Sequence, residues 1–437
     1  MAKYYDIDPE TCSIEELEKT IDDVNLKEQQ FNTMQGAAKV FLNAAYGSLG
    51  ATYYNLAGQN INGCTTTDMA ASITAQCRDI IKYSARQVNE YFQNDWNNDI
   101  DAHKKIADKM KEIYPDFDTE RFLYLASHNP LIFSTLQIYG DTDSAYVTLQ
   151  PIVDACQIPL EQQEHFDVAV YECAMEDMID QRLTEYAKSL HCPKNLEVFE
   201  LERISRAGVF LAKKNYVVDQ CYLADSKEYL APLSALSTTG FDTVKGTISK
   251  VIRDLLNDFI HFVFEKLAEG RKPNQGEIVK KLRELKTRFV MQSPNDISNA
   301  MSISEYDKFV ADDKQPGGPI FFELNDKGKK LSVPIHVRAA ATYNNLLQTK
   351  GSKYLSKYSL LRSGDKVRFY YAKSNSPLDA DDTAFGFVPD NFPLEFAPDM
   401  NIDKQFEKMV LSPLNRIIVA LGYNEIPPTL TYTAGLF

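Results

Sequence analysis

The chain has 437 residues, of which 44% are hydrophobic, and a formal net charge of −14. This length allows about three domains of roughly 150 residues each. No apolar run approaches the roughly 20 residues of a membrane span and the N-terminus is polar, so we expect neither a span nor a signal peptide. The acidic charge argues against a surface that is basic all over, but a nucleic-acid groove needs only local positive charge.

The seven cysteines contain no Cys-x-x-Cys pair. They indicate free thiols in a reducing cytosol and no zinc site. We therefore expect a cytoplasmic protein without a membrane partner.

The N-terminal region is predicted to form a long helix. Ser13-Ile-Glu-Glu16 has the pattern of a capping box, so a helix should begin there and run past Phe31. Farther on, four residues fall at i, i+4, i+7 and i+8 on one helical face: Lys39, Asn43, Tyr46 and Gly47. This mixed face suits neither a core nor solvent. A lysine there could neutralise a phosphate, and a tyrosine beside glycine could let a base pair lie flat, although close helix packing also explains the glycine.

The next region contains a second long helix, expected from Thr67 through Tyr91, and then an acidic hairpin. Residues 138–147 read Ile-Tyr-Gly-Asp-Thr-Asp-Ser-Ala-Tyr-Val, with β-branched and aromatic flanks. This pattern predicts two antiparallel strands with a tight connection. Asp141 and Asp143 point to the same side of an extended chain, and such carboxylates repel unless a cation lies between them or one keeps a proton. Oxygen-only ligands suit Mg²⁺. A plain surface turn is the alternative, because Asp-Thr-Asp-Ser is common in turns.

Residues 161–190 have a helical pattern, and Val198 to Ile204 are expected to form a strand that carries Glu200 and Glu202. In the following stretch, 210–218, Lys214 and Tyr216 should share one face of a strand. They could supply a phosphate or base-edge donor and a stacking surface without reading sequence. An alternating Lys/Tyr strand is also common at sheet edges.

The C-terminal part is expected to be largely helical over 243–287, with loops at 293–296 and 315–319 and another helix after Pro334. Between Arg338 and Lys373, eight basic residues stand against Asp365 alone, which indicates either a DNA-binding segment or a solvated face. The chain then ends on an apolar tail. Because Pro427 and Pro428 hold the chain extended, this tail should project clear of the body.

Two of these patterns together resemble a known family. Lys39-x-x-x-Asn43-x-x-Tyr46-Gly47, followed by Tyr139-Gly-Asp141-Thr-Asp143-Ser144, is similar to motifs B and C of B-family DNA polymerases. The stretch around Lys214 and Tyr216 resembles the Lys-x-Tyr motif of that family, and the segment from Pro334 to Asn344 resembles the thumb of its T-even-like bacteriophage branch.

The resemblance implies an α+β fold with an antiparallel palm sheet and packed helices, a long fingers helix and a mainly helical thumb. Residues 1–50 would be the second half of the fingers with motif B. Residues 51–236 would be the palm, with an insertion at about 93–132, and residues 237–437 the thumb with a clamp-docking tail at 429–437. Asp118-Thr-Glu120 inside the insertion looks like an exonuclease motif, but that domain precedes the polymerase motifs in this family.

The resemblance also implies the chemistry, which is addition of a dNTP to a primer 3′ end with two Mg²⁺ ions. Asp143 would be the bridging ligand and Asp141 a supporting one. The nucleotide would contact Lys39, Asn43 and Tyr46. The DNA contacts would be Gly47, Lys214, Tyr216, His336 and Arg338. A sliding clamp would receive Tyr432, Leu436 and Phe437.

The chain departs from the family in one respect. Motif A, an Asp before a Ser-Leu-Tyr-Pro-Ser type stretch, precedes motif B in the family, and nothing like it occurs in these 437 residues. We therefore expect the C-terminal subunit of a split polymerase, in the host cytoplasm if viral. Its N-terminal partner would carry the exonuclease and motif A and share the Mg²⁺ ions. Without that partner, the palm should expose a large apolar patch.

Two alternatives remain. The first is a non-catalytic DNA-binding and clamp-docking module whose acidic pair is vestigial. The second is a fragment of a single-chain polymerase.

Overall fold

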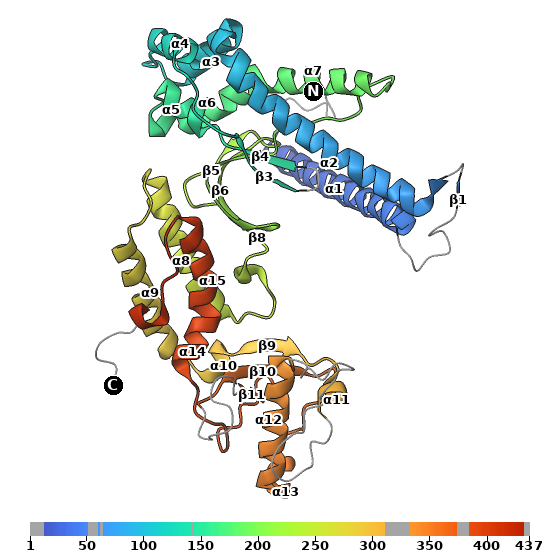
Figure 1. Cartoon of the computed structure of the whole chain (residues 1–437), viewed down its shortest axis with the longest axis vertical. Coiled ribbons are helices and arrows are strands. Elements are labelled where there is room, and N and C mark those ends of the chain that lie inside the picture. The colour runs from blue at the N-terminus through green and yellow to red at the C-terminus, as the bar shows by residue number, and fades with distance from the viewer. Residues whose placement is uncertain are drawn as a thin grey trace. The chain divides into compact units, whose positions relative to one another are not determined.

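The computed structural model describes residues 13–50, 60–61, 64–141, 144–310, 333–373 and 384–431 (Figure 1). Helices combine with antiparallel sheets, which confirms the predicted α+β class. The chain divides into two compact units. The first holds the described residues up to Asp95 together with Phe133–Thr148, and the second holds Trp96–Ile132 and the described residues from Leu149 onward. Within the described ranges, no helix is long and apolar enough to cross a membrane.

The first unit begins with α1 (Ile14–Gly50), a single helix of 37 residues. The Ser13 Oγ accepts a hydrogen bond from the Glu16 N–H at 3.3 Å, and the Glu16 carboxylate accepts one from the Ser13 N–H at 3.1 Å. The predicted capping box is thus confirmed, and these bonds to Ser13 lower the pKa of Glu16. Two-residue strands β1 (Asn60–Ile61) and β2 (Cys64–Thr65) follow.

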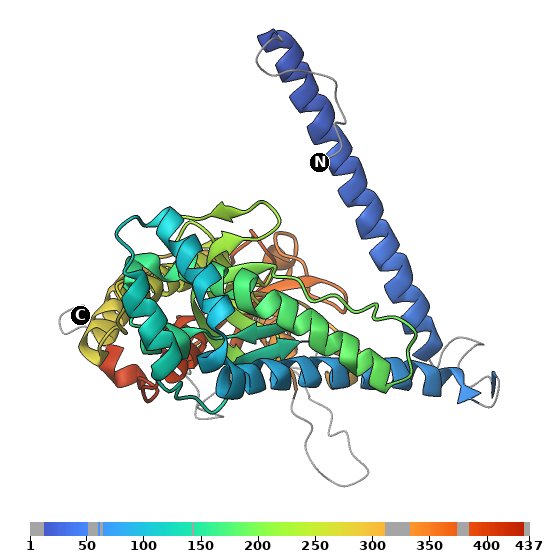
Figure 2. The same cartoon turned by 90° about the horizontal axis from the view of Figure 1, so that it is seen from above.

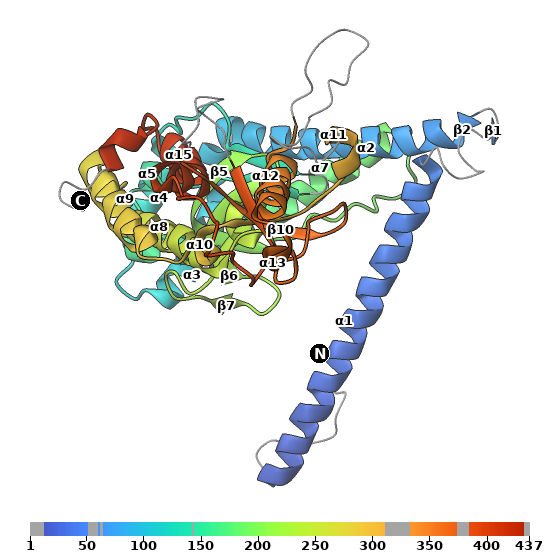
Figure 3. The same cartoon turned by 90° about the horizontal axis from the view of Figure 1, so that it is seen from below.

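The second predicted helix is α2 (Thr66–Glu90), which continues into a π-helical turn, η1 (Tyr91–Asp95). Helices α1 and α2 meet at the C-terminal end of α1 and diverge along the rest of it (Figures 2 and 3). The same unit contains β3 (Gln137–Asp141) and β4 (Ser144–Val147), which pair antiparallel with Asp141 opposite Ser144. The two predicted strands are confirmed, and residues 142–143 between them lie outside the described residues.

The second unit begins with a helical segment that includes most of the predicted insertion. Its elements are η2 (Trp96–Asn98), α3 (Ile100–Ile113), α4 (Thr119–His128), α5 (Gln150–Cys156), η3 (Leu160–Gln162), α6 (Gln163–Val170), η4 (Tyr171–Met175) and α7 (Glu176–Ser189). Asp99 and Asp118 cap α3 and α4 by accepting N–H groups at 3.0 Å. Asp118 therefore has a structural role, in agreement with our rejection of an exonuclease motif. The three-region division into fingers, palm and thumb stays a prediction.

A four-stranded antiparallel sheet follows, formed by β5 (Arg203–Ala212), β6 (Asn215–Leu223), β7 (Glu228–Tyr229) and β8 (Leu236–Thr239). Strand β6 lies between β5 on one side and both β7 and β8 on the other. The strand predicted from Val198 to Ile204 begins only at Arg203, because residues 195–202, including Glu200 and Glu202, have no regular secondary structure. The ladder begins where Arg203 faces Leu223, the last residue of β6, so the preceding residues have no strand opposite them within this sheet.

The rest of the second unit combines helices with a three-stranded sheet of order β11-β10-β9. Its elements are η5 (Asp242–Val244), α8 (Lys250–Ala268), α9 (Gln275–Val290), α10 (Pro294–Ile297), β9 (Asn299–Ser302), α11 (Tyr306–Phe309), α12 (Ile335–Lys350), α13 (Ser352–Leu355), β10 (Lys366–Tyr371), β11 (Ala384–Phe387), α14 (Ile402–Phe406), η6 (Glu407–Leu411), α15 (Ser412–Ala420) and η7 (Pro428–Thr431).

The helix expected after Pro334 is α12, which packs closely on β11. A Cβ added at Gly386 would lie 2.9 Å from the Ala339 carbonyl, so this contact needs glycine. The loop expected at 293–296 is wrong: Ser293 caps the one-turn helix α10, with its Oγ accepting the Asp296 N–H at 3.3 Å. The loop predicted at 315–319 lies outside the described residues.

The start of the C-terminal tail is also different from the prediction. Pro428–Thr431 form a 3-10 turn instead of extended chain. The Leu430 N–H bonds to the Pro427 carbonyl at 3.1 Å, and Arg283 of α9 donates to the Leu430 carbonyl at 2.9 Å. Proline fits the first position of a helical turn, so the two prolines start a turn that packs on α9. Residues 432–437 lie outside the described part of the chain.

Candidate active site and its supports

Asp141 is the last residue of β3 and is half-buried. Opposite it, the Ser144 hydroxyl donates to the Asp141 carbonyl oxygen at 3.1 Å. Two steps down the ladder, the rings of Tyr139 and Tyr146 meet edge to face with centroids 5.7 Å apart, a geometry that stabilises cross-strand pairs. The hairpin thus presents a carboxylate at the end of a paired strand. Asp143 lies outside the described residues, so the predicted pairing of the two carboxylates stays a prediction.

Helix α2 holds the base of this hairpin. The Asn89 Oδ1 accepts the Leu136 N–H at 2.7 Å, and the Asn89 amide donates to the Thr135 hydroxyl at 3.3 Å. The Leu136 side chain is fully buried, and its carbonyl accepts the Thr148 N–H at 2.8 Å. Asn89 therefore positions the residues that lead into β3, and the Leu136 carbonyl holds the residue that follows β4. Sequence reasoning missed it, because an asparagine within a helical pattern is usually a surface residue.

The predicted nucleotide-binding face lies entirely on α1, because that helix runs unbroken from Ile14 to Gly50. Lys39, Asn43, Tyr46 and Gly47 therefore lie on one helix at the spacing that the sequence predicted. Lys39 is exposed. The side-chain surroundings of the other three lie outside the described residues, and all four roles stay predictions.

Lys214 lies in a turn, so the prediction that it shares a strand face with Tyr216 is wrong. Ala212 pairs with Asn215, and Lys214 stands between them with a left-handed φ of 55°. Tyr216 lies on β6, where it is half-buried and pairs with Phe210 of β5. The two rings are 5.5 Å apart.

Gly240 fixes the position of this turn. Its φ is 64°, and a Cβ added there would lie 1.9 Å from the Lys214 carbonyl oxygen. A side chain at this position is excluded by both the backbone conformation and the contact. The sequence contains no signal for the contact, since Gly240 follows the turn by 26 residues.

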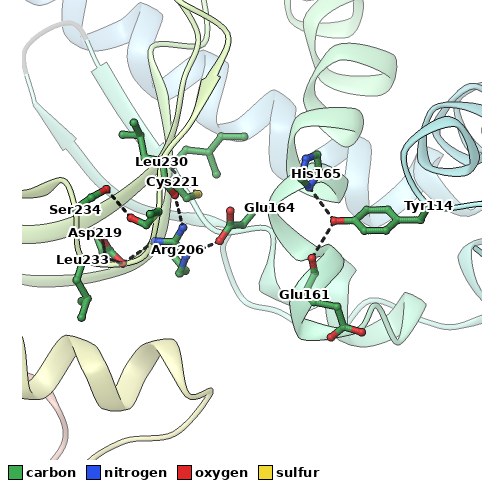
Figure 4. Close-up of polar contacts among 12 residues, drawn as sticks. Tyr114, Glu161, Glu164, His165, Arg206, Asp219, Cys221, Leu230, Leu233 and Ser234 are labelled. Carbon is green, nitrogen blue, oxygen red and sulfur yellow. Dashed lines mark hydrogen bonds and ion pairs between the residues drawn. The ribbon is translucent and has the colours of Figure 1, made fainter.

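At the other end of the same hairpin, Arg206 organises a buried polar network (Figure 4). The β5–β6 register shifts between Ser205 and Ala207, so Arg206 stands at a β-bulge that re-aims its side chain. Its guanidinium bonds to the Asp219 carboxylate at 2.8 Å, to the Leu230 carbonyl at 2.9 Å, and to Glu164 of α6. Burial alone would lower the pKa of Arg206, but the hydrogen bonds to the two carboxylates outweigh it and raise the pKa.

A second group of contacts ties α3 and α6 to the same sheet (Figure 4). The Tyr114 hydroxyl lies 2.9 Å from both the Glu161 carbonyl oxygen and the His165 Nδ1. Burial raises the pKa of Tyr114 and lowers that of His165. The His165 ring stacks on Tyr229 of β7 with centroids 4.0 Å apart. The segment 96–132 is thus anchored through α6 to the sheet that carries Lys214 and Tyr216.

The remaining predicted site residues lie apart from these groups. His336 on α12 is only 8% exposed, and burial lowers its pKa. Arg338 is half-buried on the same helix. Contact of His336 with DNA would require this part of α12 to be uncovered. Tyr432, Leu436 and Phe437 lie outside the described residues. In the part of the chain that the structure describes, no three His, Cys, Asp or Glu residues form a group that could hold a metal ion.

Comparison with known proteins identifies the family. Residues 14–319, well over half of the chain, match the family model of DNA polymerase family B. The chain therefore belongs to DNA polymerase family B, which makes it a DNA-directed DNA polymerase domain that acts on DNA and deoxynucleoside triphosphates. Members of this family generally use divalent metal ions. Comparison with individual curated proteins gives no match.

Proposed function

We propose that this chain is the C-terminal subunit of a split B-family replicative DNA polymerase of the T-even-like bacteriophage branch. The observation that carries the proposal is the β3–β4 hairpin. It places Asp141 at a strand end with Asp143 two residues later, in a chain that matches the family but contains no motif A. In this proposal the motif A carboxylate comes from a second polypeptide.

The donor chemistry at the hairpin fits Mg²⁺, because carboxylate oxygens are its preferred protein ligands. Asp143 and Asp141 would hold the ions together with a carboxylate of the partner. When bound, Mg²⁺ activates the primer 3′-hydroxyl and neutralises charge on the leaving pyrophosphate. The half-buried position of Asp141 and its backbone pairing with Ser144 keep this carboxylate at a fixed point.

Other residues of the chain would position the substrates. Lys39 is exposed on α1, where it would neutralise the β- and γ-phosphates of the incoming nucleotide, with Asn43 and Tyr46 along the same helix. Lys214 would meet a primer phosphate from the β5–β6 turn, and Tyr216 beside it would offer a flat surface. Gly47, His336 and Arg338 would contact the duplex. These contacts position the DNA without reading its sequence.

The C-terminal residues Tyr432, Leu436 and Phe437 would dock on a sliding clamp. Because Pro428–Thr431 already pack on α9, the test is deletion of residues 432–437 only. We expect single-nucleotide addition to stay intact while stimulation by the clamp is lost. Unchanged clamp-dependent synthesis would show that this tail has another role.

The catalytic assignment is tested by Asp143→Asn in the complex of this chain with its partner. Loss of a metal ligand should lower the incorporation rate by about 100-fold or more, while the affinity for primer-template stays nearly constant. Asp116→Asn, an exposed carboxylate between α3 and α4, is the matched control and should be silent. Wild-type rates for Asp143→Asn would favour the alternative of a non-catalytic DNA-binding module.

A further inference from the structure

Helix α9 carries an open pocket next to the last described residues of the chain. The pocket has a volume of about 480 Å³ and is lined by Gln275, Gly276, Val279, Lys280, Arg283 and Leu430. This volume lies within the range of about 300–1,000 Å³ that is typical of pockets for ligands. Val279 is half-buried and Leu430 is 40% exposed. The pocket therefore leaves apolar surface in contact with water.

The pocket also holds two basic side chains. Lys280 and Arg283 are both exposed, and neither forms an ion pair with any residue that the structure describes. The other three basic residues of α9 each pair with a carboxylate: Lys281, Lys286 and Arg288. A lysine and an arginine without a carboxylate partner are available to contact the face of an aromatic ring.

The segment that follows the pocket in the chain is apolar and aromatic. Arg283 donates to the Leu430 carbonyl at 2.9 Å and Thr431 is buried, so the chain leaves the body beside the pocket. The next six residues read Tyr-Thr-Ala-Gly-Leu-Phe and contain no charged side chain. Six extended residues reach about 20 Å, whereas α9 measures about 12 Å from Gln275 to Arg283. Every residue that lines the pocket is therefore within reach of this segment.

Attachment to the same chain favours this segment over a ligand from solution. A short flexible connection gives an effective concentration in the millimolar range. A segment of the chain can therefore fill a pocket of only millimolar affinity, whereas a free ligand at micromolar concentration would leave that pocket empty.

We propose that residues 432–437 fold back onto this pocket, with the Phe437 ring packed on Val279. The Lys280 and Arg283 side chains then contact the face of that ring. While the tail is in the pocket it is withheld from other partners, so a clamp must displace it. This displacement rests on the proposed function, whereas the docking of the tail on α9 does not.

The test uses the full-length chain with Phe437→Trp. The only other tryptophan is Trp96, which is fully buried, so quenching of the fluorescence by acrylamide reports on residue 437. The reference is a peptide of residues 429–437 with the same substitution. If about two thirds of the tails are docked, the quenching constant should be about threefold lower in the chain than in the peptide.

Lys280→Glu in the Phe437→Trp chain should raise the quenching constant about twofold, because a carboxylate repels the face of the ring. Lys250→Glu is the matched control and should leave the constant unchanged, because Lys250 is also exposed but lies on α8 outside the pocket.

Val279→Asp should raise the quenching constant to that of the peptide, because it removes the apolar surface on which the ring packs. Its matched control is Val251→Asp, at a half-buried valine of α8 outside the pocket, which should keep the tail docked. Circular dichroism of all four variants checks that the fold is retained.

A quenching constant equal to that of the peptide, or equal effects of Lys280→Glu and Lys250→Glu, would overturn the proposal. So would protection that disappears on dilution, because the pocket would then hold the tail of a second copy. The measurement contains no clamp, DNA or nucleotide. If it fails while deletion of residues 432–437 still abolishes stimulation by the clamp, the pocket assignment is wrong and the proposed function stands.

Discussion

Two hairpins of this chain carry the stretches that resemble polymerase motifs, and neighbouring residues support them in different ways. The β3–β4 hairpin is short, with strands of 5 and 4 residues. Asn89 of α2 holds its base through a hydrogen bond from the Leu136 N–H. The β5–β6 hairpin has strands of 10 and 9 residues and is embedded in a four-stranded sheet. Arg206 stabilises the base of this hairpin through its bond to Asp219, and Gly240 packs against the Lys214 carbonyl in its turn.

The difference indicates which parts of the active site the chain can build alone. The β5–β6 hairpin, which would contact DNA, is complete within one compact unit. The β3–β4 hairpin, which would hold metal, is a separate two-stranded sheet with Asp141 at the end of β3. Substitutions at the residues that support each hairpin test this contrast.

Arg206→Met should destabilise the second unit by about 3–5 kcal/mol. The substitution leaves the Asp219 carboxylate, whose side chain is 1% exposed, buried without its cation. Arg203→Met is the matched control on the same strand, because Arg203 makes only an exposed ion pair with Glu202 and should cost less than about 1 kcal/mol. Urea unfolding of the full chain measures both. Equal stability of the two variants would show that the network does not hold the hairpin.

Gly240→Ala should lower the free energy of unfolding by about 2–3 kcal/mol. Alanine is strained at a φ of 64°, and its Cβ would collide with the Lys214 carbonyl. The turn must move, so DNA affinity should fall as well. Gly246→Ala has open space around its Cβ and should change the free energy of unfolding by less than about 0.5 kcal/mol. If Gly240→Ala binds DNA as tightly as the wild type does, this turn does not contact the primer.

Asn89→Ala should lower the free energy of unfolding by about 1–2 kcal/mol, since the buried Leu136 N–H loses its acceptor. In the complex with the partner, the incorporation rate should fall about tenfold, because a small displacement of Asp141 disrupts the reacting geometry. The exposed Asn94 in η1, the turn that continues α2, provides the control, Asn94→Ala. If the Asn89→Ala chain is as stable and as active as the wild type, the β3–β4 hairpin does not depend on Asn89 for its position.

The sequence predicted those parts of the fold that rest on local patterns. The capping box at Ser13, the long α1 and α2 helices and the two strands around Asp141 follow from residue periodicity and turn composition. The predictions from sequence were wrong where residues far apart in the chain determine the local structure. Residues 198–202 of the predicted strand have no partner strand in the sheet, and Lys214 lies in a turn whose position is fixed by Gly240, the residue after β8.

The supports of the candidate site were not predictable either. Asn89, Arg206 and Gly240 act through contacts between residues that are 13 to 47 positions apart in the sequence. A single sequence gives no indication that such residues meet. Motif residues could be named because their chemistry and spacing are distinctive, whereas the residues that position them are ordinary polar or small residues.

The central claim is that this chain supplies only part of a polymerase active site. The most direct measurement is primer extension by the purified chain, alone and with the polypeptide that carries motif A, with Asp143→Asn as the baseline. We expect the chain alone to match the Asp143→Asn baseline and the complex to extend the primer. Robust extension by the wild-type chain alone, absent in Asp143→Asn, would contradict the claim, because the chain would then hold a complete active site.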